Sequence, residues 1–185
     1  MASVTRAPSG YSLGKFCNPG REALIKSRAS ELIELLGLES HLEGGRYREL
    51  FRSSLAVSIT GVGKKRSALT TIYYLLMEGG HSLFHRLDAD EAWHYYEGAE
   101  LELFWIDPAL KYCNRRLLGP AGELSRPVGV VPAGCWQGAR TTGEYTLVGC
   151  TVAPGFEYGD FQLLREDPEV EREIRERFPE LAALI

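Results

Sequence analysis

The sequence predicts a mainly β protein, an antiparallel sandwich or barrel with one or two helices before it and a short helix after it. Apolar residues recur at helical intervals between Glu22 and Leu38. From Tyr47 onward, short segments rich in Tyr, Ile, Val, Thr and Trp alternate with turn signals. The last twenty residues join the charged stretch Glu169–Arg177 to an apolar end, a pattern typical of an amphipathic helix.

The N-terminal helical region is the first predicted element. Its apolar residues at helical spacing are Leu24, Ile25, Leu32, Ile33, Leu35, Leu36 and Leu38. We expect one or two helices there, with a stop near Gly37.

The predicted strands follow, separated by glycine- and proline-containing pairs. These pairs are Gly-Gly at 44 and 79, Asp-Pro at 107, Gly-Pro at 119, Arg-Pro at 126 and Pro-Gly at 154. Many short strands at this spacing favour an antiparallel sandwich or barrel.

With 185 residues, the chain is close to the usual size of one domain. We interpret residues 1–21, which contain no acidic residue, as a polar N-terminal tail. Residues 22–165 are expected to form a single domain that includes the N-terminal helices. Residues 166–185 are expected to form a C-terminal helical extension.

Composition and charge exclude several classes of protein. The net charge of −4 leaves no surplus of cations for a phosphate backbone, so we expect no nucleic-acid partner. The longest apolar runs, such as Ile72–Met77, are far shorter than the roughly 20 residues of a membrane helix. The four cysteines show no C-x-x-C pair, which favours a reducing, cytoplasmic location.

Alternation along two neighbouring strands brings a histidine and a carboxylate together. One face of the first strand takes His81, Leu83, His85 and Leu87, and the other takes Ser82, Phe84 and Arg86. After a turn at residues 88–90, Glu91, Trp93 and Tyr95 share a face. We therefore expect His85 and Glu91 to meet across a hairpin.

Glu49 and Arg52 are a second pair of charged residues close in sequence. Because they are three apart in an extended segment, we expect them on opposite faces, each paired with other strands. Their predicted role is structural.

Two motifs resemble those of the cupins. Gly79, five residues, His85, then Glu91, six residues and Gly98 follow the first cupin motif, Gly-x5-His-x-His-x3-4-Glu-x6-Gly. The slot of its second histidine holds Leu87. Pro132-Ala-Gly134-Cys-Trp-Gln137 is similar to the second motif, Pro-x-Gly-x-x-His, with Gln137 in the position of the histidine.

The resemblance extends over about residues 30–165 and is to the fifth cupin family, a branch described as a domain of unknown function. The segments that carry it are Glu43–Ser53, Thr70–Tyr73, Phe84–Arg86, Asp90–Gly98, Val131–Gln137 and Leu147–Phe156. It implies a double-stranded β-helix, or jelly roll, that is commonly a homodimer and has a ligand pocket inside the barrel. It implies no settled reaction, so function must be argued from the site.

A cupin metal centre normally has two or three imidazoles and a carboxylate. In this chain the matching positions would offer His85, Glu91 and Gln137 to a divalent metal, and Leu87 offers nothing. No cofactor is favoured on these grounds, and a divalent metal is the alternative.

Without a metal, the same residues suit acid–base chemistry. A histidine beside a carboxylate is a typical general base or acid near neutral pH. We expect His85 as the base and Glu91 as the carboxylate that orients it. Ligand contacts are expected from Gln137, Trp93, Tyr95, Tyr47 and Tyr73.

Three functions remain open, so the sequence does not decide whether the protein is an enzyme. The first is a metal-independent isomerase or epimerase acting on a carbohydrate-like or nucleotide-linked molecule, similar to the deoxysugar epimerases among the cupins. The second is a non-catalytic ligand-binding or sensor protein. The third is a metal-dependent oxygenase or isomerase, which Leu87 disfavours.

Overall fold

The structure is a computed structural model that describes residues 26–58 and 65–185. The predicted tail of residues 1–21 and the beginning of the predicted helical region lie outside the described residues.

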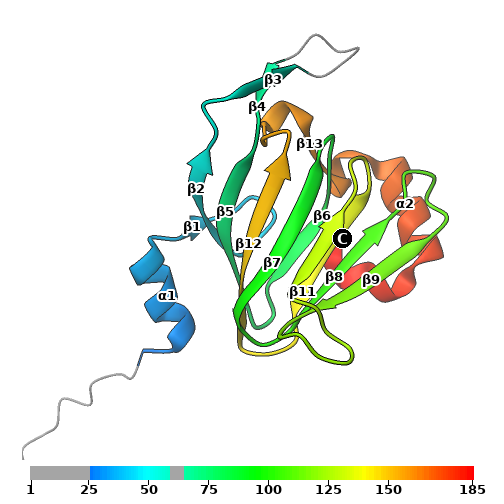
Figure 1. Cartoon of the computed structure of the whole chain (residues 1–185). Helices are drawn as coiled ribbons and strands as arrows, with labels where there is room; N and C mark the ends of the chain where they lie inside the picture. Colours follow the sequence, from blue (N-terminus) through cyan, green and yellow to red (C-terminus); the bar gives the residue numbers. More distant parts are fainter. Residues whose placement is uncertain (1–25, 59–64) are drawn as a thin grey trace, which may run out of the picture.

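Two antiparallel sheets form the body of the described chain (Figure 1). The six-stranded sheet has the order β1 (Glu39–Ser40), β2 (Arg46–Arg52), β5 (Thr70–Met77), β12 (Tyr145–Ala153), β7 (Asp90–Gly98) and β10 (Val128–Val131). The five-stranded sheet has the order β13 (Phe161–Leu163), β6 (His81–Leu87), β11 (Trp136–Thr141), β8 (Leu101–Ile106) and β9 (Cys113–Leu118). A separate hairpin pairs β3 (Ala56–Ser58) with β4 (Lys65–Ser67). The predicted mainly β jelly roll is confirmed.

A single helix, α1 (Arg28–Leu36), precedes the strands in the described chain. Ser27 caps its first turn, because the side chain accepts a hydrogen bond from the Ser30 amide. Gly37 ends it with a φ of 62°, as predicted. Leu32 packs with Leu75 and Leu147, which places the helix on the outer side of β5 and β12.

The C-terminal segment covers the outer face of the five-stranded sheet, as Figure 1 shows. Short 3-10 turns at Tyr158–Asp160 (η1) and Leu164–Glu166 (η2) lead to α2 (Pro168–Arg177) and the 3-10 helix η3 (Pro179–Leu184). The apolar side chains that join these helices to the sheet are Phe84, Phe104, Ile106, Trp136, Ile174, Leu181 and Leu184. The expected C-terminal helix is therefore present, divided at Pro179 because proline has no N–H to continue a helical ladder.

The space between the two sheets has two different halves. One half is filled with apolar side chains, including Leu76, Leu101, Leu103, Leu118 and Val148, which are fully buried. The other half contains buried polar groups and a cavity. Leu76 and Tyr74 of β5 belong to the same buried cluster, but only Tyr74 also lines the cavity, so the cavity occupies one end of the strands.

Among the described residues, no helix is long and apolar enough to cross a membrane. Cys113, Cys135 and Cys150 are free thiols, and the last two are buried. The predicted homodimer and the cytoplasmic location stay predictions, as does the absence of a nucleic-acid partner.

Candidate functional site

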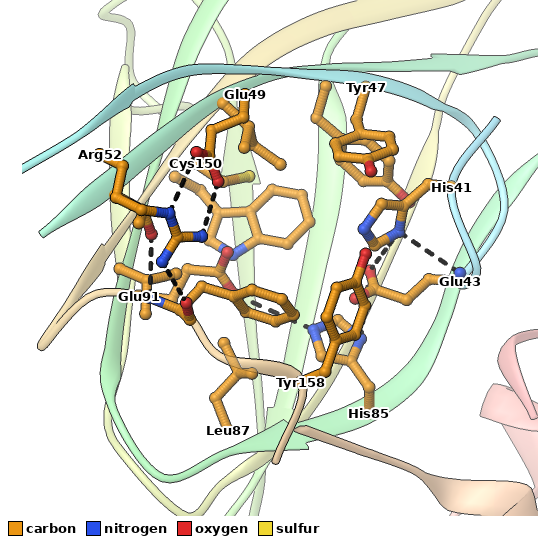
Figure 2. A pocket seen from close by; sticks show the side chains of 16 residues that line it. His41, Glu43, Tyr47, Glu49, Arg52, His85, Leu87, Glu91, Cys150 and Tyr158 are labelled. Atoms are coloured by element: carbon orange, nitrogen blue, oxygen red, sulfur yellow. Dashed lines mark hydrogen bonds and ion pairs between the residues drawn. The ribbon is translucent and has the colours of Figure 1, made fainter. Parts of the chain in front are cut away.

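A cavity of about 250 Å³ opens between the two sheets. Its buried side chains include Glu43, His85, Glu91 and Trp93. The remaining lining residues are His41, Tyr47, Glu49, Arg52, Thr70, Ile72, Tyr74, Leu87, Cys150, Val152, Phe156 and Tyr158. Figure 2 shows the Arg52–Glu49 pair on one side of the cavity and His41, Glu43 and Tyr158 on the other.

Glu43 reaches the barrel interior from the loop between β1 and β2. Gly44 in this loop has a φ of 103°, and a Cβ atom there would lie 2.3 Å from the His81 carbonyl oxygen, so only glycine fits. The Glu43 carbonyl accepts a hydrogen bond from the Leu83 amide at 2.9 Å. This contact fixes the loop to β6 and places the Glu43 carboxylate beside that strand. Glu43 is buried, with 6% of its surface exposed.

A bulge in β6 determines which side chains meet Glu43. Gln137 of β11 lies opposite His85 and Ala139 lies opposite Ser82, so the register shifts by one residue between them. Ser82, which simple alternation places on the face opposite His85, therefore points inward. Its hydroxyl donates to Glu43 Oε2 at 2.9 Å.

His85 lies between two carboxylates. Its Nδ1 is 3.4 Å from Glu43 Oε2, and its Nε2 is 3.9 Å from Glu91 Oε2. Nδ1 also contacts the Leu83 carbonyl oxygen at 2.9 Å. The predicted meeting of His85 and Glu91 is confirmed, but not through a hairpin: β6 and β7 belong to different sheets, and the two side chains approach across the barrel.

Glu91 is fixed by a chain of two buried hydrogen bonds. Gln137 Nε2 donates to Glu91 Oε2 at 2.5 Å, and Trp93 Nε1 donates to Gln137 Oε1 at 3.1 Å. Gln137 is 1% exposed and stands behind Glu91, outside the cavity lining. Its amide is thus a support for the carboxylate.

The two cavity histidines are driven toward opposite charge states. Burial acts to lower the pKa of His85, but Glu43 and Glu91 outweigh it and raise the pKa to about 9. Burial lowers the pKa of His41, and Glu43 offsets only part of this effect. Near neutral pH, His85 is an imidazolium and His41 is neutral.

Glu49 and Arg52 line the same side of the cavity, which corrects the prediction that they lie on opposite faces. The register of β2 against β5 shifts between Glu49 and Phe51, so that the extra residue returns Arg52 to the inner face. Arg52 donates twice to Glu49, at 3.1 and 2.7 Å. It also donates to the Phe156 carbonyl at 2.9 Å and to Glu157 at 3.2 Å, which ties β2 to the segment before η1.

Of the predicted aromatic contacts, Tyr47 and Trp93 line the cavity. Tyr73 points to the outer face of β5, where its ring lies 6.0 Å from that of Tyr96. Tyr95 lies toward the far end of β7 from Glu91 and donates its hydroxyl to the Gly98 carbonyl at 2.6 Å. The prediction placed these two tyrosines at the ligand; Tyr74 and Tyr158 occupy the cavity wall instead.

The family model described as Cupin superfamily (DUF985) matches residues 30–164. The chain belongs to the cupin superfamily. No curated protein matches this cupin.

Solved structures similar to this cupin include two that share substantial sequence with it. A protein from Shewanella oneidensis is 38% identical, with a TM-score of 0.67, over 75% of this chain and 85% of that chain. A hypothetical protein from Leishmania major is 31% identical, with a TM-score of 0.72, over 85% of this chain and 97% of that chain. Oxalate decarboxylase from Bacillus subtilis is 14% identical, with a TM-score of 0.52, over 79% of this chain and 36% of that chain, which is a likeness of fold alone.

The residues at the cupin metal positions do not fit a metal centre. Leu87 presents only hydrocarbon to the cavity, and the Gln137 amide is already bonded to Glu91 and Trp93. No group of three or more His, Cys, Asp or Glu side chains in the described part of the chain is arranged to hold a metal ion.

Sequence reasoning gave no role to His41, Glu43 or Tyr74, and it gave Arg52 only a structural one. Glu43 and Arg52 belong to a segment that carries the family resemblance, Glu43–Ser53, and this was the available signal. The resemblance does not show which way these side chains point. Glu43 points inward because its loop is bonded to β6, and Arg52 points inward because of the bulge in β2.

Proposed function

We propose that this cupin binds a small polar molecule in its cavity and moves a proton on it without a metal, as an isomerase or epimerase does. The observation that carries the proposal is the buried His85 imidazole held between Glu43 and Glu91 at the cavity wall. Isomerisation beside a carbonyl requires one group that takes a proton from carbon and another that gives a proton to the carbonyl oxygen. Glu91 and His85 line the cavity side by side, with Oε2 and Nε2 3.9 Å apart.

In the proposed reaction, Glu91 takes the proton from the carbon next to a carbonyl group. The C–H bonding electrons form the C=C bond of an enediol, and the carbonyl oxygen receives the Nε2 proton of His85. Return of the proton from Glu91 to the other carbon of the enediol moves the carbonyl to the carbon that first lost its proton. His85 recovers its proton from the hydroxyl, so the enzyme ends as it began.

The raised pKa supports His85 as the proton donor, in place of the base that the sequence suggested. An imidazolium with a pKa of about 9 is protonated near neutral pH and cannot accept a further proton. Both of its neighbours are carboxylates, and Glu91 is held in position by Gln137. Raising the pKa of one group so that it stays protonated is how enzymes assign it the acid role.

The test is hydrogen exchange with solvent. Small aldoses, ketoses and amino sugars are incubated with the protein in D2O. Proton NMR follows the loss of the signal of the hydrogen on the carbon beside the carbonyl. We expect exchange with the wild-type protein and a rate lower by about 10²–10⁴-fold in His85→Gln. Circular dichroism checks that the variant is folded; an unchanged rate in the folded variant would remove His85 from the reaction.

A second candidate is ligand binding without turnover. It is favoured by the internal pairing of the cavity charges, since Arg52 is bonded to Glu49 and Glu157 and His85 lies against Glu43 and Glu91. Ligand-induced shifts of protein signals without exchange in the same samples would support this candidate over the isomerase.

A further inference from the structure

The charge and the walls of the cavity indicate the class of ligand, provided that the proposed function is right that a small molecule enters it. We propose that the ligand is a cation, a single-ring polyhydroxy molecule with a protonated amino group. An amino sugar has this chemistry.

The charged groups that line the cavity do not balance one another. Three carboxylates, Glu43, Glu49 and Glu91, face one guanidinium, Arg52. A positive charge on His85 still leaves one negative charge in excess, and a neutral His85 leaves two. An excess charge in a partly desolvated site is costly unless it is paired, so a positive ligand is stabilised there and a negative one is repelled.

Arg52, the only guanidinium that lines the cavity among the described residues, already has hydrogen-bond partners within the protein. Arg52 donates to both oxygens of Glu49, to Glu157 and to the Phe156 carbonyl. A phosphate or carboxylate ligand would have to compete with these partners for it. Glu43 and Glu91, in contrast, have no guanidinium or ammonium partner among the described residues: Glu43 lies beside His85, His41 and Ser82, and Glu91 beside His85 and Gln137.

Aromatic side chains form part of the cavity wall. The rings that line the cavity belong to Tyr47, Tyr74, Trp93, Phe156 and Tyr158. His41 lies edge-on to Tyr47 at 4.5 Å and to Tyr74 at 5.5 Å, and Tyr74 lies 5.9 Å from Trp93, so these rings adjoin one another. Phe156 and Tyr158, 5.2 Å apart, form a second pair. The faces of such rings attract ammonium groups.

The volume of the cavity limits the size of the ligand. A cavity of about 250 Å³ is just below the range of about 300–1,000 Å³ that is usual for drug-sized ligands. One sugar ring suits this space, whereas a nucleotide-linked sugar is too large to be enclosed in it.

The experiment compares three probes of nearly equal shape and different charge by isothermal titration calorimetry, slightly below neutral pH. These are D-glucosamine, D-glucose and D-glucuronate. We expect glucosamine to bind about tenfold more tightly than glucose, the effect of one charged hydrogen bond, and glucuronate to bind more weakly than both. Tighter binding of glucose or glucuronate would overturn the inference and leave the proposed binding function standing. No heat from any of the three would contradict both.

Two variants at Tyr47 separate the ring from the hydroxyl. Tyr47→Phe keeps the aromatic face, and Tyr47→Leu removes it. We expect the leucine variant to bind glucosamine about two- to fivefold more weakly than the phenylalanine variant, with no matching change for glucose. An equal loss for both sugars in Tyr47→Leu would assign the ring a merely steric role and contradict the cationic ligand.

Discussion

The two halves of the barrel interior share strands β5, β7 and β12 but differ in what they bury. In the closed half, Leu101, Leu103 and Leu118 are completely inaccessible and pack in one apolar cluster. In the open half, His85 and Glu91 are almost as deeply buried, yet each polar atom requires a partner and the packing leaves a cavity. Burial therefore stabilises the closed half through apolar contacts, whereas in the open half it brings carboxylates close to His85 and so changes the pKa of that side chain.

The largest expected effect on stability comes from the closed half. Leu103→Ala is expected to lower the free energy of unfolding by about 2–5 kcal/mol, because it leaves a void in a packed cluster. Ile72→Ala, a truncation in the cavity wall, is expected to cost less, since Ile72 already borders empty space. Urea denaturation measures both, and equal losses would break the distinction between the halves.

The next effect is a pH dependence that belongs to the open half. The pKa of His85 is raised from 6.5 to about 9 in the folded protein, so its stabilisation is complete below pH 6.5 and is lost as the pH rises through 9. The shift corresponds to roughly 3 kcal/mol. Thermal unfolding of wild type and His85→Gln across this pH range measures the difference; parallel curves would mean that the His85 proton does not stabilise the fold.

The smallest effect tests the support behind Glu91. Gln137→Leu removes the partner of the Trp93 N–H and of Glu91, and leaving these buried groups unpaired is expected to cost about 1–3 kcal/mol. Gln162→Leu is the matched control, because Gln162 is half-buried and bonded to Arg86 at 2.6 Å. If Gln137→Leu lowers the free energy of unfolding no more than Gln162→Leu does, the buried hydrogen bonds of Gln137 contribute no more to stability than a half-buried one.

The elements that follow from local pattern were predictable. The helix that ends at Gly37, the strands between turn residues and the C-terminal helix each depend on neighbours in sequence. The proximity of His85 to Glu91 was also predictable, although the reason was wrong, because the two strands lie in opposite sheets. A sequence pattern gives which face a residue occupies along its own strand and does not give the strand that it faces.

The wrong face assignments of Arg52 and Ser82 have one cause. Alternation assumes an unbroken strand, but bulges in β2 and β6 change the face of Arg52 and Ser82 relative to Glu49 and His85. The choice of Tyr73 and Tyr95 failed in a related way, because the position of Tyr73 on β5 points outward and that of Tyr95 lies too far along β7.

The sequence by itself determined the family, the order of the elements and the identity of the His85, Glu91 and Gln137 positions. Only the tertiary structure decided that Glu43 enters the barrel, that Arg52 joins Glu49 at the cavity, and that Gln137 turns its amide to Glu91. The physical reason is that these placements depend on contacts between segments distant in sequence, and that the charge of a buried histidine is set by the carboxylates that such contacts bring to it.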